Sequence, residues 1–139
     1  MGQSLHFYRI KYDPQFIESS DIETILRKLK EELKSKLGID EITYDSFFEP
    51  IEEISLYLSA DDPKFEKLLG TGAKNLLHPN SRCYLVTEDL WKVIEEMILQ
   101  MSNKLKSSDR SQETSEEYLK DRELLKKMYD KKILMVEAS

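Results

Sequence analysis

Residues 83–106 read CYLVTEDLWKVIEEMILQMSNKLK, and this stretch decides the fold class because a strand pattern is followed directly by a helix pattern. The first four residues form a short apolar run, which is typical of a buried strand. Thr87 then precedes a long run in which apolar side chains recur at helical spacing. Acidic residues begin this predicted helix and lysines end it, as the helix dipole favours. The apolar face consists of Leu90, Trp91, Ile94, Met97, Ile98, Met101 and Leu105.

A second helix is predicted upstream of this stretch. Ser20 and Glu23 match a capping box, in which each side chain satisfies a free backbone N–H of the other residue. Gly38 follows the last apolar position and fits the residue just after a helix end. The charged residues on the other face are interpreted as a solvated surface. The apolar positions are Ile22, Ile25, Leu26, Leu29, Leu33 and Leu37.

The remaining periodic segments predict one more long helix and two strands. Thr114 and Glu117 match another capping box, so we expect a helix over residues 114–130. Residues 107–113 are polar and predict a mobile loop before that helix. Apolar and aromatic enrichment favours strands at residues 5–12 and 133–136.

Residues 47–58 fit two patterns. Phe47, Ile51, Ile54 and Leu58 fall on one side of a helix at about 100° per residue. Because proline is tolerated only in the first turn, such a helix would begin no earlier than Phe47. Alternating apolar residues between 54 and 58 offer a competing strand interpretation, and we expect the helix.

The sequence therefore predicts a single α+β domain over residues 1–139. We expect three long or medium amphipathic helices packed on a small sheet of about three short strands. Asp62 and Pro63 predict the N-cap and first residue of an additional short helix. The glycines at 70 and 72 would end that helix, and a loop through His78 would follow.

Several functional classes are disfavoured by composition. No apolar run approaches the roughly 18 residues that span a bilayer, and the N-terminus lacks a secretory pattern. Cys83 is the only cysteine, which excludes an internal disulfide and a cysteine-rich zinc site. No basic stripe suggests nucleic-acid binding. We expect a cytoplasmic protein that binds no membrane, nucleic acid, metal or cofactor.

The distribution of charge is the most informative feature for function. The net charge is -6 at pH 7. Residues 39–62 contain eight acidic residues and no Lys or Arg, whereas the other 19 acidic residues are balanced by 21 basic ones. The whole acidic excess therefore lies in this acidic segment. Its members are Asp40, Glu41, Asp45, Glu49, Glu52, Glu53, Asp61 and Asp62.

The simplest interpretation of the acidic segment is a surface that keeps a small protein soluble. The more specific hypothesis is a non-enzymatic interaction protein that binds a basic partner protein. An apolar anchor would be surrounded by charges that steer the partner. The spacing of the acids does not match an EF-hand calcium loop. The expected binding residues are Glu49, Glu52, Glu53, Leu56, Tyr57, Asp61 and Asp62.

Two alternative functions remain open. A small-molecule-binding domain or enzyme could use a pocket near His6, His78, Arg82 and Tyr84, if these residues converge around a cavity. Neither histidine belongs to a metal-ligand spacing motif. A self-associating structural protein is the third possibility. No catalytic residue is assigned, since Cys83 lies in an apolar run where burial makes a thiol inert.

Residues 82–90, RCYLVTEDL, resemble a run in the YfbM-like family of small bacterial proteins of unknown function. The opening with Phe7 and Tyr8, the segment 56–72 and the apolar ending at 133–136 are similar as well. Val86 departs from the family's Tyr-Leu-Thr pattern. The resemblance implies an α+β domain but no activity and no functional residues. Small bacterial domains of this type include candidates for immunity or antitoxin proteins, which block a partner by steric masking.

Overall fold

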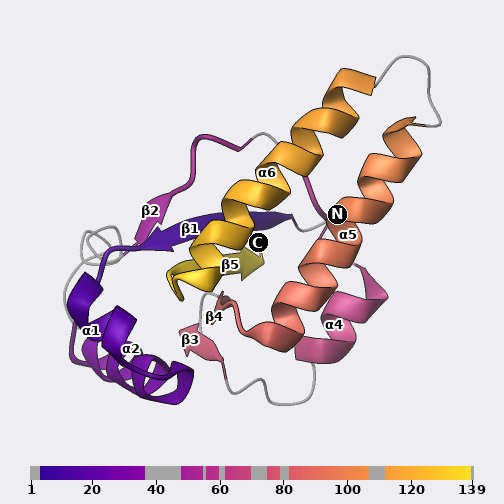
Figure 1. Cartoon of the computed structure of the whole chain (residues 1–139). Coiled ribbons are helices and arrows are strands. Elements are labelled where there is room, and N and C mark those ends of the chain that lie inside the picture. The colour runs from indigo at the N-terminus through magenta and orange to yellow at the C-terminus, as the bar shows by residue number, and fades with distance from the viewer. Residues whose placement is uncertain are drawn as a thin grey trace.

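The computed structural model describes residues 4–36, 48–54, 56–59, 62–69, 75–78, 82–106 and 112–138 (Figure 1). Helices and strands alternate irregularly along the chain. In chain order they are β1 (Leu5–Ile10), α1 (Pro14–Ser19), α2 (Ile22–Lys36), β2 (Phe48–Pro50), α4 (Pro63–Leu69), β3 (Leu76–His78), β4 (Cys83–Leu85), α5 (Glu88–Lys106), α6 (Gln112–Asp130) and β5 (Leu134–Ala138).

The strands form one antiparallel sheet in the order β2-β1-β5-β4-β3. The C-terminal strand β5 lies at the centre, because it pairs with β1 on one side and with β4 on the other. Phe7 lies opposite Val136 in the first pairing, and Tyr84 lies opposite Val136 in the second. The two ends of the chain are therefore neighbours in the sheet.

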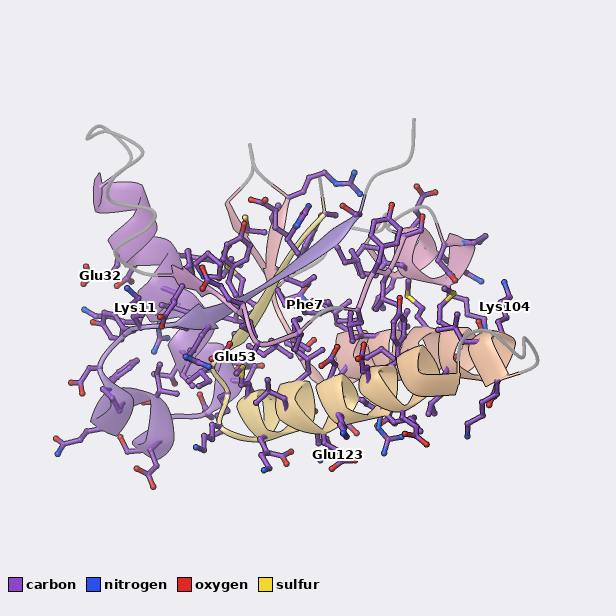
Figure 2. All side chains as sticks on the ribbon, turned by 90° about the horizontal axis from the view of Figure 1, so that it is seen from above. Phe7, Lys11, Glu32, Glu53, Lys104 and Glu123 are labelled. Atoms are coloured by element: carbon purple, nitrogen blue, oxygen red, sulfur yellow. The ribbon has the colours of Figure 1, made fainter. Side chains whose placement is uncertain are left out.

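Each face of the sheet contributes to a different hydrophobic cluster. Phe7, Tyr84 and Val136 belong to a cluster with apolar residues of α4, α5 and α6. Ile10 and Met135 belong to a second cluster with residues of α1 and α2. Successive side chains of a strand point to opposite faces, so the sheet is buried on both sides. Figure 2 shows α5 and α6 along one side of the sheet, whereas α1 and α2 lie near the C-terminal end of β1.

The three long helices were predicted correctly, but two of their N-termini were not. Asp21 caps α2, because its Oδ1 atom accepts a hydrogen bond from the Thr24 backbone N–H at 2.8 Å. The predicted capping box of Ser20 and Glu23 is therefore wrong. Helix α6 begins at Gln112, so Thr114 lies inside the helix rather than at its cap. A capping motif indicates that a helix starts nearby, and a neighbouring Asp can take the same role.

The C-terminus of α6 ends in a tight turn that leads into β5. The Ile133 N–H donates to the Met128 carbonyl at 3.1 Å, and the Lys132 N–H donates to the Tyr129 carbonyl at 2.9 Å. This is the Schellman pattern, in which Lys132 takes the left-handed position with φ 62. The Lys132 ammonium also donates to the Ser20 carbonyl at 2.8 Å, which ties this turn to the start of α2.

The sheet is larger than the sequence predicted, with five strands instead of about three. The expected helix over residues 47–58 is wrong, since residues 48–50 form the edge strand β2 and residues 52 and 53 form a turn. Ile51 and Leu58 are buried as expected, but on an extended chain, and Ile54 is half-buried. Phe48, which was not among the expected core residues, is buried as well, and Phe47 lies outside the described residues. β3 lies where a loop through His78 was expected, and the short helix α1 was not predicted from the sequence. A strand of three residues is too short for the alternation of apolar and polar residues to be recognised in the sequence.

Other expectations are confirmed or fall outside the described residues. Asp62 and Pro63 begin α4 as predicted. Among the residues that the structure describes, no helix combines the length and the apolar character that crossing a membrane requires. Gly38, the glycines at 70 and 72 and residues 107–111 of the expected loop lie outside the described residues, while residues 112 and 113 belong to α6.

The role of Asp21 as the N-cap of α2 can be tested by measuring stability as a function of pH. Hydrogen bonds from the Thr24 side chain and backbone lower the pKa of Asp21 below its ordinary value. A lowered folded-state pKa means that the carboxylate stabilises the fold above the pKa of the unfolded chain. This stabilisation is lost as the pH falls through the lowered folded-state pKa. We expect Asp21→Ala to lower the urea midpoint at neutral pH, with a difference from the parent protein that shrinks toward acid pH.

Asp21→Asn is the matched control for this experiment. Asparagine is an equally good N-cap but does not titrate, so it should retain most of the stability at neutral pH. A midpoint difference between the parent protein and Asp21→Ala that stays constant down to strongly acidic pH would contradict the assignment of the cap.

Candidate functional site

The structure describes half of the acidic segment. Glu49 lies on β2, Glu52 and Glu53 lie in the turn after it, and Asp62 precedes α4. All three glutamates are exposed. The other four predicted members, Asp40, Glu41, Asp45 and Asp61, lie outside the described residues.

Arg9 of β1 neutralises part of this charge. Its guanidinium lies 3.5 Å from a Glu49 carboxylate oxygen and 3.5 Å from a Glu53 carboxylate oxygen. Arg9 and Glu49 are direct partners in the pairing of β1 with β2. The sheet therefore brings a cation to two carboxylates that lie in a stretch of sequence without Lys or Arg. Exposed ion pairs of this kind contribute little stability, about 0–1 kcal/mol.

The carboxylates of Glu52 and Asp62 differ in the contacts that they already make within the chain. The Asp62 Oδ1 atom accepts the Lys64 backbone N–H at 2.9 Å, so this carboxylate is occupied in starting α4. Glu52 is exposed and forms no ion pair with any other described residue. Among the described acids of the segment, Glu52 is the one whose charge is least compensated.

Residues 56–59, which we call the connecting segment, alternate between the core and solvent. Leu58 is buried, and Leu56 is half-buried against the same hydrophobic cluster. Tyr57 is 59% exposed, and it is the only large hydrophobic side chain found exposed among the described residues. Of the two anchors expected from the sequence, Tyr57 is therefore accessible and Leu56 is largely used in packing.

The connecting segment is held by two buried side chains of α6. The Tyr118 hydroxyl accepts a hydrogen bond from the Tyr57 N–H at 3.0 Å and lies 3.2 Å from the Tyr57 carbonyl, to which it donates. An Asp121 carboxylate oxygen accepts the Leu56 N–H at 3.1 Å. Sequence reasoning missed these roles. The signal in the sequence was that Tyr118 and Asp121 carry polar atoms at positions of the helix that face the core.

The backbones of the residues expected around a small-molecule pocket lie on three parts of the sheet: His6 on β1, His78 on β3, and Arg82 and Tyr84 at β4. His6 lies opposite Glu137, Glu137 lies opposite Cys83, and Cys83 lies opposite His78 in the strand register. This register places both histidine backbones in one row across the sheet. Tyr84 belongs to the cluster on the opposite face from Cys83.

Arg82 directly precedes β4, and its backbone takes an unusual conformation. It has a positive φ of 48, and its carbonyl accepts the Ala138 N–H at 3.2 Å. The positive φ is a left-handed conformation that non-glycine residues adopt rarely. The Arg82 backbone therefore helps to align β4 with the end of β5.

Two polar contacts involve residues of this histidine row. The Cys83 thiol donates to a Glu137 carboxylate oxygen at 3.3 Å, and Cys83 is fully buried. The Ser4 hydroxyl lies 3.1 Å from the His6 Nε2 atom. Within the described ranges no group of three or more His, Cys, Asp or Glu side chains could hold a metal ion, and no buried side-chain polar atom lacks a partner.

Displaced pKa values on α6 have packing explanations. Burial raises the pKa of Tyr129, whose ring stacks on Trp91 with centroids 5.2 Å apart. A hydrogen bond to Asp130 raises the pKa of Lys126. Shifted pKa values gather at catalytic sites, but pairs of this kind on one helix also produce them.

Comparison with known proteins gives no match to a protein-family model, to a curated protein or to a solved structure. Inference about function therefore depends on the side chains themselves.

The burial of Cys83 predicts low thiol reactivity. A thiol must reach solvent as the thiolate to react with a disulfide reagent, and Cys83 has no exposed surface. We expect the folded protein to react with an aromatic disulfide at least about 100-fold more slowly than the urea-unfolded chain, because reaction requires local opening. Rapid stoichiometric labelling of the folded protein would contradict a structural role for Cys83.

Proposed function

We propose that this chain is a non-enzymatic interaction protein that binds a basic partner protein through its acidic segment, residues 39–62. The observation that supports the proposal most directly is the placement of charge, because the whole acidic excess falls within 24 consecutive residues. Binding would mask a basic surface of the partner, in the manner of an immunity or antitoxin protein. Membership of the YfbM-like family stays a prediction.

The described contacts sharpen this proposal. Glu52 provides uncompensated charge, and Tyr57 provides exposed apolar area close to it in the chain. A charged rim around an aromatic anchor is a common arrangement of protein interfaces. Arg9 opposes the same function, because it offsets the charges of Glu49 and Glu53. A basic partner surface would compete with Arg9 for these carboxylates.

Removing charges of opposite sign should change binding in opposite directions. Glu52→Gln should weaken the binding of a captured basic protein about two- to fivefold, and Arg9→Gln should strengthen it by a similar factor. The measurement is quantitative pull-down from extract of the native host, repeated at low and high ionic strength. Binding steered by charge should decrease steeply as salt is added.

Glu18→Gln is the matched control, because Glu18 is an exposed carboxylate on α1, away from the acidic segment in the chain. It should leave capture unchanged. Capture that does not depend on salt, or that changes equally with Glu18→Gln and Glu52→Gln, would contradict the proposed function. Light scattering of the purified protein tests the alternative of self-association.

A further inference from the structure

The connecting segment, residues 56–59, is fixed at both ends. At its C-terminal end, the Leu5 N–H donates to the Leu58 carbonyl at 2.9 Å, and Ser59 forms a β-bridge with Ser4. At its other end, the backbone of Leu56 and Tyr57 is bound by Tyr118 and Asp121, as described above. The segment is thus held between the first strand and the last helix.

The hydrogen bonds from α6 come from groups that are shielded from water. Tyr118 is 7% exposed and Asp121 is 8% exposed. One hydroxyl satisfies both the N–H and the carbonyl of Tyr57, which belong to the two peptide groups on either side of its Cα, so displacement of the Tyr57 backbone would break two bonds at once. A buried hydrogen-bond group that loses its partner is strongly unfavourable, which opposes such displacement.

The consequence of this arrangement is a rigid backbone beneath an exposed aromatic ring. The inward-facing leucines on either side of Tyr57 are packed against the core. The Tyr57 ring therefore projects from a backbone that is already ordered. An ordered anchor loses less conformational entropy on binding than an anchor on a mobile loop.

We infer that Tyr118 and Asp121 are positioning residues that hold Tyr57 ready to receive an arginine side chain of a partner protein. The inference rests on the proposed function and names the partner chemistry at that same surface. A guanidinium stacks on an aromatic face and pairs with carboxylates in a planar fork, which an ammonium group cannot do. The chain's own Arg9 guanidinium already lies between Glu49 and Glu53.

Amide hydrogen exchange tests the positioning without any partner. Tyr118→Phe removes the hydroxyl and keeps the buried ring, so the Tyr57 amide should exchange at least about tenfold faster. Tyr129→Phe is the matched control, because Tyr129 lies on the same helix and its hydroxyl makes no hydrogen bond to another described residue. Asp121→Ala should accelerate exchange of the Leu56 amide, and Asp121→Asn should restore protection because an amide oxygen still accepts.

Binding is tested with a short synthetic peptide of alternating arginine and glycine, added to the isotopically labelled protein and followed by NMR. We expect shifts centred on Tyr57, Glu52 and Glu53. The corresponding lysine peptide should bind about tenfold more weakly, and Tyr57→Ala should weaken arginine-peptide binding by a similar factor. Tyr118→Phe should weaken it in the same direction, whereas Tyr129→Phe should not.

The outcomes separate the inference from the proposed function. Faster exchange in Tyr118→Phe together with weaker arginine-peptide binding in both Tyr118→Phe and Tyr57→Ala supports the inference. Unchanged exchange in Tyr118→Phe overturns it. Equal binding of arginine and lysine peptides, or binding that Tyr57→Ala does not alter, also overturns it. If binding nevertheless weakens with Glu52→Gln and with salt, the proposed function survives without the inference. Absence of peptide binding to the parent protein overturns the inference, and the pull-down alone then decides the function.

Discussion

The burial of β5 on both faces is the constraint on which the rest of the structure depends. Leu134, Met135 and Val136 are fully buried, yet Leu134 and Val136 belong to one hydrophobic cluster and Met135 to the other. The apolar side chains of β5 are removed from water on both faces only if helices cover both faces of the sheet. It also needs β1 and β4 on its two edges to pair its backbone groups. The last strand of the chain therefore determines where the first strand and the two sets of helices must lie.

The same sheet changes the meaning of the charge pattern. In sequence, Glu49 and Glu53 belong to a stretch without any compensating cation. In the fold, β1 brings Arg9 to both carboxylates. The described part of the acidic surface therefore carries less uncompensated negative charge than the composition suggests. Its uncompensated charge is carried by Glu52, next to a buried apolar residue, Ile51, that fixes the end of β2.

The α5–α6 pair has two roles that are separated along its length. Near one end, Ser102 and Ser115 are buried against each other, with hydroxyl oxygens 2.8 Å apart and each hydroxyl able to donate to the other's carbonyl. Small, mutually satisfied polar residues let the two helices approach closely. Further along α6, Tyr118 and Asp121 turn their polar atoms toward the connecting segment instead. One helix thus completes the core and orders the surface that we propose as the binding site.

The sequence by itself determined the long helices, the strands β1, β4 and β5 and the start of α4, because each has a local signal in spacing or capping. The sequence also placed Tyr57 and Glu52 in a polar stretch, and both are exposed in the fold, while their role as binding residues stays a prediction. Tertiary structure alone decided that residues 48–50 form a strand, that Arg9 meets Glu49 and Glu53, and that Tyr118 and Asp121 hold the connecting segment. These contacts join residues far apart in the chain. A local pattern carries no information about a partner that only the closed sheet brings into range.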